Sequence, residues 1–154
     1  MSYGMTGAVT GAAVTGLTSP TYTLSADTAI DSNARQSVVT ALGGTQTGVS
    51  AHSVSSPFSV TVTRPRSLNQ LGKANLNGFI PNVGRNTYRV IARKGVTPAL
   101  GQPYQVAVAR TEYEIPTGSD SYDAANVKAL ISFHSGFIWA NANGIADTTA
   151  NAVL

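Results

Sequence analysis

Apolar and polar residues alternate with a period of two in five short segments of the chain, a pattern typical of strands that bury one face. In the clearest segment, Phe58, Val60 and Val62 share one parity, and hydroxyl residues occupy the other. We therefore predict strands over residues 21–25, 37–42, 58–64, 85–94 and 104–115.

The period changes to that of an α-helix after residue 119. Capping and acidic residues at 119–123 precede an apolar stripe, which predicts a helix from about residue 122 to residue 142, ended by Gly144. A second, short helix is predicted over 145–154. The stripe has to be buried, either on this chain's own sheet or on a neighbour's. Its members are Val127, Leu130, Ile131, His134, Phe137 and Ile138.

The order of these elements, strands first and helices last, indicates the α+β class, with an antiparallel meander sheet followed by two C-terminal helices. A length of 154 residues suits one domain. Within it we expect N-terminal strands or an arm over 1–57, the main sheet over 58–116 and the C-terminal helices over 119–154. Residues 1–19, a loose repeat of Gly, Ala, Thr and Val, fit either a weak strand or a flexible arm.

Charge is distributed unevenly along the chain, although the net charge is only +3. Residues 32–111 contain nine of the ten Lys and Arg residues and no Asp or Glu. This excess of positive charge creates an electrostatic field that attracts polyanions, most commonly nucleic-acid phosphate. The alternative is a solvated basic face without a ligand. On one predicted strand, Arg85, Arg89 and Arg93 share a parity, with Thr87 and Ile91 between them on the same face. Alternate strand residues lie about 6.6 Å apart, a spacing comparable to that of successive phosphates, so the arginines occupy every second such position.

The sequence offers little material for catalysis or metal binding. It contains no Cys and two His, His52 and His134, which disfavours a disulfide, a thiolate metal site and a Ser-His-Asp triad. We expect no enzyme activity, no cofactor and no metal. The longest apolar run, 127–140, is shorter than the roughly 20 residues needed to cross a bilayer, so we expect no membrane partner. The segment Met1–Gly16 lacks the basic residues of a secretory signal, and we expect it to be retained.

Three strings of the sequence carry a resemblance to a known family: FSVTVTRPRSLN, NTYRVIARK, and the closing run TEYEIPTGSDSYDAANVKALISFHSGFIWANANGIADTTANAVL. In this order they resemble the coat (capsid) proteins of small single-stranded-RNA bacteriophages, the levivirus-like proteins. The resemblance covers roughly residues 58–154. Against the family layout, the strand over 85–94 is either the fifth strand or the sixth; in the second case residues 73–81 form the fifth.

The resemblance implies an assembly as well as a fold. It implies an obligate, intertwined homodimer with a continuous ten-stranded sheet, in which the helical stripe forms the dimer interface. Dimers would close into an icosahedral shell of many copies with T=3 geometry. The inner sheet surface would bind a hairpin of the single-stranded genomic RNA, so that the protein packages the genome and acts as a translational repressor. Assembly would take place in the host bacterial cytoplasm and yield a virion.

The resemblance also implies the RNA-binding residues, which are transferred by strand parity. The strand over 58–64 would present Thr61 and Thr63 to a flipped-out adenine. Ile91 occupies a position where the family often has lysine, which is a departure from the usual adenine pocket. The residues expected to bind RNA are Thr61, Thr63, Arg66, Arg85, Thr87, Arg89, Arg93 and Arg110.

Two other classes of function remain open at this point. A dimeric β-sheet regulator that binds nucleic acid without assembling would have the same basic face. Particle size separates the two, because a regulator remains a dimer in solution. A small enzyme is the weaker alternative, since its chemistry would depend on His52 or His134.

Overall fold

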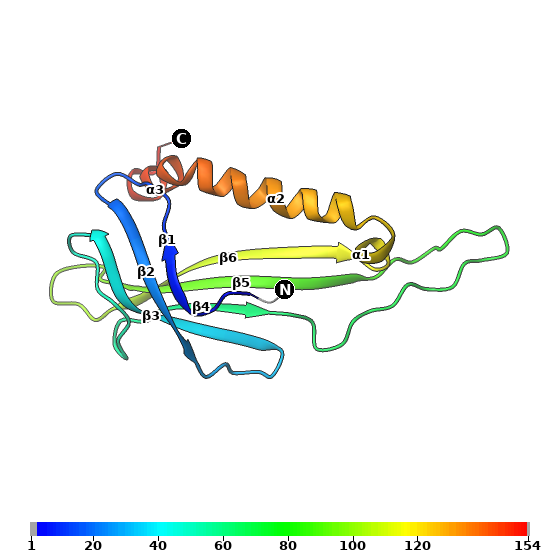
Figure 1. Cartoon of the computed structure of the whole chain (residues 1–154), viewed down its shortest axis with the longest axis horizontal. Helices are drawn as coiled ribbons and strands as arrows, with labels where there is room; N and C mark the ends of the chain where they lie inside the picture. Colours follow the sequence, from blue (N-terminus) through cyan, green and yellow to red (C-terminus); the bar gives the residue numbers. More distant parts are fainter. Residues whose placement is uncertain (1–2, 154) are drawn as a thin grey trace.

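The chain folds as one layer of sheet and one layer of helices, in a computed structural model that describes residues 3–153 (Figure 1). The α+β class and the antiparallel meander are confirmed, because each strand pairs antiparallel with the next in the order β1-β2-β3-β4-β5-β6. The strands are β1 (Gly7–Thr10), β2 (Thr18–Asp27), β3 (Ala34–Thr45), β4 (Phe58–Thr63), β5 (Arg85–Val96) and β6 (Gln105–Pro116). The helices are α1 (Ser119–Tyr122), α2 (Ala124–Ala140) and α3 (Ala142–Asn151).

The strand that begins at Arg85 is the fifth of the sheet, which settles the order that the sequence left open. Residues 73–81 form no strand, so the alternative that placed the fifth strand there is wrong. The N-terminal segment supplies three strands. The predicted strands over 21–25 and 37–42 lie within β2 and β3, and of the two alternatives for residues 1–19 the weak strand is found, as the four-residue β1. The sheet therefore has six strands, one more than the five in each subunit that the resemblance implies.

The long helix ends earlier than the sequence predicts. We expected Gly144 to end it, but Gly144 lies inside α3, and α2 ends at Ala140. The break is at Asn141, whose backbone N–H and side-chain Nδ2 both donate to the carbonyl of Phe137, at 3.0 and 2.9 Å. These bonds complete the last turn of α2, and α3 starts from the next residue. Residue 154, at the end of the second predicted helix, lies outside the described residues, as do residues 1–2 of the N-terminal segment.

The longest ladder of the sheet joins β5 to β6, from Arg85 opposite Pro116 to Val96 opposite Gln105. Since side chains alternate between the two faces of a strand, this register fixes which residues share a face. Tyr88 lies opposite Tyr113 on the side of the sheet that faces α2. The odd-numbered residues of β5 and the even-numbered residues of β6 therefore point away from the helices.

The hydrophobic core of the single chain is small. Among the described residues, Val39, Val62 and Ile115 are the buried hydrophobic side chains of the core. The helix α2 passes over β6 (Figure 1), yet none of its residues is buried. The chain's own sheet therefore does not fully bury the apolar stripe of α2.

One polar contact ties the two ends of the described chain together. The sheet curls so that the connection between β1 and β2 rises beside α3 (Figure 1). There the backbone N–H and the hydroxyl of Thr15 both donate to Oδ1 of Asn143, at 2.6 and 2.8 Å. The N-terminal hairpin and the last helix are thereby held side by side.

The β2–β3 ladder contains an irregularity that only glycine accommodates. Its register shifts between Thr18 and Thr21, and Gly44 lies there with a φ of 74°. A Cβ at Gly44 would stand 2.2 Å from the carbonyl oxygen of Ser19 and 2.5 Å from that of Thr18.

We predict that Gly44→Ala lowers the free energy of unfolding by about 2 kcal/mol or more, since it adds a backbone clash to the roughly 1–2 kcal/mol cost of a left-handed alanine. The matched control is Gly78→Ala, where φ is 76° and nothing lies near the added Cβ; it should show the left-handed cost alone. Denaturant unfolding of both variants measures the difference, and equal losses would contradict the close approach at Gly44.

Candidate nucleic-acid interface

The face of the sheet that points away from the helices carries seven of the eight residues predicted to bind RNA. Cross-strand partners bring them together: Thr61 lies opposite Ile91, which in turn lies opposite Arg110. We call this surface the basic face and define it by Thr61, Thr63, Arg85, Thr87, Arg89, Ile91, Arg93 and Arg110.

The eighth predicted residue, Arg66, lies in the loop after β4 rather than on a strand. Its guanidinium forms an ion pair with Asp31 at 2.7 Å, and its side chain remains 80% exposed. The backbone N–H of Asn33, and then the hydrogen bond from Arg66, hold the pKa of Asp31 below its ordinary value. Arg66 nevertheless shares one open depression of about 380 Å³ with Arg85 and Arg89. The loop therefore extends the basic surface beyond the end of β4.

Folding places carboxylates beside two arginines of the basic face. Nε of Arg89 lies 2.7 Å from Oε1 of Glu112, and Arg85 lies 3.8 Å from Glu114. The count of charges in residues 32–111 does not reveal these pairs, because Glu112 and Glu114 lie just after that segment in β6. They come close to the arginines only through the pairing of β5 with β6. Such exposed pairs stabilise a protein by about 0–1 kcal/mol and remain accessible to a competing phosphate.

Two arginines of the basic face have no carboxylate partner within residues 3–153. Arg110 is exposed on the edge strand β6. Arg93 is half-buried and donates instead to the hydroxyl of Thr61, at 2.8 Å. On the basic face, these two guanidinium groups are therefore the ones that an anionic ligand can bind without displacing a carboxylate.

A chain of hydrogen bonds continues from Arg93 across the sheet. The Thr61 hydroxyl donates to Oε1 of Gln36 at 3.1 Å, and Nε2 of Gln36 donates to Asp27 at 2.7 Å. The hydrogen bond from Gln36, followed by the backbone N–H of Thr28, holds the pKa of Asp27 below its ordinary value. Thr61 thus both accepts and donates within the protein, and a base that bonds to it has to replace one of these partners.

Two strand residues among the nine bases of residues 32–111, Lys94 and Arg35, lie on the helix side of the sheet and not on the basic face. Nζ of Lys94 lies 5.0 Å from the ring centre of Phe58, on the helix side, and donates to the carbonyl and hydroxyl of Ser50 at 3.0 Å each. Burial lowers the pKa of Lys94. Arg35 lines a depression with Val62 and Tyr88, also on the helix side. The basic segment is therefore divided between the two faces by strand parity.

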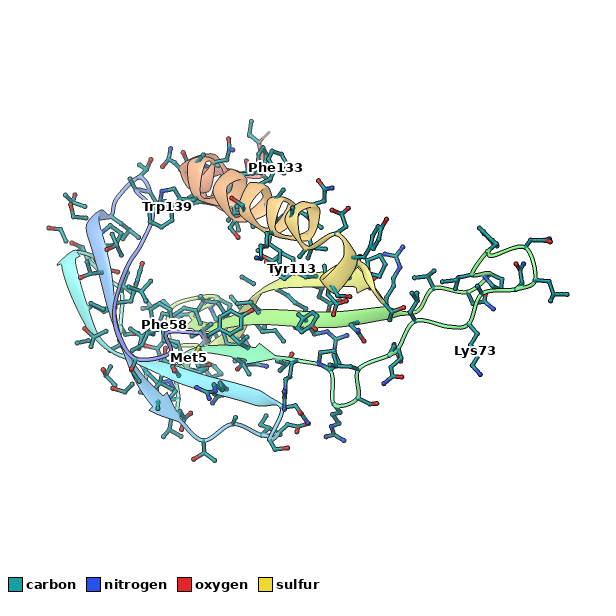
Figure 2. All side chains as sticks on the ribbon, turned by 45° about the vertical axis from the view of Figure 1, so that its right-hand side comes forward. Met5, Phe58, Lys73, Tyr113, Phe133 and Trp139 are labelled. Atoms are coloured by element: carbon teal, nitrogen blue, oxygen red, sulfur yellow. The ribbon has the colours of Figure 1, made fainter. Side chains whose placement is uncertain are left out.

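The apolar stripe of α2 is divided as well. His134 packs edge-to-face against Tyr113, with ring centres 5.7 Å apart. Val127 and Ile131 line an apolar cavity of about 290 Å³ together with Tyr113 and other sheet residues. Figure 2 shows Tyr113 between β6 and α2, pointing toward the helix. This part of the predicted stripe faces the chain's own sheet.

The remaining stripe residues stay exposed. Leu130 is 54% exposed and Phe137 is 55% exposed, and Ile138 is also exposed. Phe133, which the sequence analysis missed, is 71% exposed and lies 6.2 Å from Phe137, ring centre to ring centre. Figure 2 shows Phe133 on the side of α2 away from the sheet. We call Leu130, Phe133 and Phe137 the outer stripe. Because they are three and four residues apart, they lie on one side of a helix, and this spacing predicts that Phe133 belongs with the other two.

Within residues 3–153, no three His, Asp or Glu side chains come close enough to hold a metal ion. None of the helices in this same range has the length and apolar composition that a membrane span requires.

Solved structures with the same architecture identify the family. The chain is similar to a virus-like particle of bacteriophage ESE020, with 52% sequence identity over 99% of this chain and 100% of that chain, at a TM-score of 0.97. The protein belongs to the levivirus-like coat proteins. This coat protein also has the fold of a virus-like particle of Beihai levi-like virus 32, at 14% identity over 86% of this chain and 88% of that chain and a TM-score of 0.55. No family model matches the sequence, and no curated protein does.

The family membership confirms two expectations from the sequence. The resemblance to coat proteins of small single-stranded-RNA bacteriophages is confirmed, and so is the absence of enzyme activity, because coat proteins are structural. As a coat protein, the chain is a component of the virion.

Proposed function

We propose that this coat protein assembles as homodimers into an icosahedral shell of T=3 geometry and encloses single-stranded genomic RNA. One observation carries the proposal: a single sheet separates two incomplete surfaces, an exposed apolar helix on one side and the basic face on the other. The similarity to the bacteriophage ESE020 virus-like particle supports shell formation.

The dimer forms along β6 in this proposal. This strand is twelve residues long and lies at the edge of the sheet, so one row of its backbone N–H and C=O groups has no partner strand among the described residues. Long exposed edges of this kind readily pair with another chain. Val106 and Val108, 51% and 49% exposed, add apolar surface at the same edge. Pairing two β6 strands makes one continuous sheet.

The helices complete the dimer. With the sheets joined at β6, the α2 helices of the two copies lie near the symmetry axis, because α2 passes over β6. The outer stripe of each copy then packs on the partner, while Val127, Ile131 and His134 hold the helix against Tyr113 and its neighbours. Of the six predicted stripe residues, Leu130, Phe137 and Ile138 then contact the partner together with Phe133. The other three support this interface from the side of the chain's own sheet.

The basic face becomes the inner floor of the shell. Arg93 and Arg110 contact phosphates directly, and Arg85 and Arg89 exchange their carboxylate partners for phosphate. Thr61, Thr63, Thr87 and Arg66 surround these cations, and Ile91 offers apolar contact to a base. Binding of a genomic hairpin at this face makes the protein a translational repressor, and assembly on that RNA takes place in the bacterial cytoplasm.

We predict that Leu130→Asp dissociates the dimer, because it places an unpaired carboxylate in an apolar interface. Native mass spectrometry should show a monomer, and electron microscopy should show no particles. Ser132→Asp, which adds the same charge to an exposed position elsewhere around α2, is the matched control and should leave dimers and particles unchanged. Wild-type dimers that bind RNA but never form particles would favour the non-assembling regulator instead.

We predict that Arg93→Ala and Arg89→Ala each reduce the RNA content of particles. Each should also reduce the magnitude of the slope of log K for RNA binding against log salt concentration by about 1, since each removes one phosphate contact. The fold should be intact by circular dichroism. Lys128→Ala is the control of equal charge change on α2, on the other side of the sheet, and it should leave the slope unchanged. A slope that all three variants lower equally would mean that net charge, rather than the basic face, governs RNA binding.

A further inference from the structure

The loop between β4 and β5 projects from the molecule as an arm. Figure 1 shows this segment extending well beyond the end of the sheet, on the side where α1 lies. We call residues 67–84 the projecting arm; Lys73 marks it in Figure 2. Loops of such length without secondary structure are uncommon in compact domains and usually have a function.

The base of the arm is fixed to the sheet by polar contacts. The backbone N–H of Asn69 donates to Oδ1 of Asn86 at 2.8 Å, and Nδ2 of Asn69 donates to the carbonyl of Arg85 at 2.7 Å. The N–H of Thr117 donates to the carbonyl of Gly84 at 2.9 Å. These bonds tie both limbs of the arm to the ends of β5 and β6.

The tip of the arm is closed by a single side chain. Oδ1 of Asn75 accepts from the backbone N–H groups of Asn77 and Phe79, at 3.0 and 2.9 Å. The N–H of Asn75 donates to the carbonyl of Phe79 at 2.8 Å, and Gly78 has the positive φ of 76° that the turn requires. The tip is thus a built turn that presents its side chains in a defined arrangement.

The arm presents apolar side chains to solvent. Leu76 is fully exposed, and Phe79 is 66% exposed. Leu68, Leu71 and Val83 are also exposed along the limbs. Lys73 is the only charged residue in 67–84. A concentration of exposed apolar groups on a fixed projection indicates a protein contact, and the near absence of charge disfavours RNA as the occupant.

We propose that the tip of the projecting arm packs against a coat-protein copy outside its own dimer and thereby joins neighbouring dimers. The inference rests on the proposed shell. In a dimer joined along β6, we expect the partner's sheet to lie beside β6, whereas Figure 1 shows the arm continuing along the strand direction past the end of this chain's sheet. The occupant is therefore a second copy of this chain from the next dimer.

The comparison with the solved particle supports this placement. The alignment with the bacteriophage ESE020 particle covers 99% of this chain, so it includes the arm, and the TM-score of 0.97 indicates that the arm follows the same course there. The conformation of the arm in the single chain is thus also that of a related chain solved as a virus-like particle.

Site-specific photo-cross-linking tests the proposal in assembled particles. The chain has no Cys, so Leu76→Cys provides one attachment point for a benzophenone maleimide. Particles should give a cross-linked pair of chains, and free dimers of the same variant should give none. Val54→Cys, at a fully exposed position of the β3–β4 connection, is the control. It should give a much weaker pair in particles. A cross-link to RNA, equal cross-linking in free dimers, or equal yields from both positions would overturn the proposal.

A second variant measures the strength of the contact. Leu76→Ser combined with Phe79→Ser should leave the dimer and its unfolding midpoint unchanged, but should raise the protein concentration needed for particle assembly about tenfold or more, as light scattering measures. Ile30→Ser combined with Val54→Ser is the matched control of two exposed apolar residues. If the wild type forms particles and the tip variant needs no higher protein concentration to assemble, the arm contact is contradicted but the shell is not. Absence of wild-type particles would contradict the shell itself.

Discussion

The exposed apolar surface of α2 is the constraint on which the rest of this structure depends. An amphipathic helix derives most of its stability from packing its apolar side, yet α2 has no buried residue in the single chain. Burial of one large apolar side chain contributes about 1.5–3 kcal/mol, so the outer stripe alone represents several kcal/mol that the monomer does not realise. A second copy supplies that packing in our proposal, which makes the dimer the unit that folds.

In our proposal, the sheet serves both dimer assembly and RNA binding, because its side chains alternate between two faces. One face of β5 and β6 supports the helix through Tyr88, Tyr113 and Ile115, and the other carries the arginines. A one-residue shift in register would exchange the two sets and bury guanidinium groups under α2. The glutamates of β6 moderate the charge of the basic face. In our proposal, this lowers the repulsion between empty dimers and still leaves cations accessible to RNA.

Much of the fold was predictable from local periodicity, and the failures have identifiable causes. Alternation located β4 and β5 to within two residues at each end and placed the predicted RNA-binding strand residues on one face. The pairing of Arg89 with Glu112 was not predictable, because it depends on cross-strand register. The end of α2 was missed because Asn141 caps the helix with its own side chain. The projecting arm has no period. Its shape depends on the tertiary contact of Asn69 with Asn86 at the base and on the local hydrogen bonds of Asn75 at the tip.

In our proposal, a second copy completes the edge strand β6 and the helix above it. Residue-resolved hydrogen exchange of the backbone amides of β6 in isolated dimers tests this most directly. We expect the amides that point away from β5 to exchange as slowly as those that bond to it, because both rows are paired in the dimer. Alternate amides that exchange at the rate of solvent-exposed groups would contradict the account.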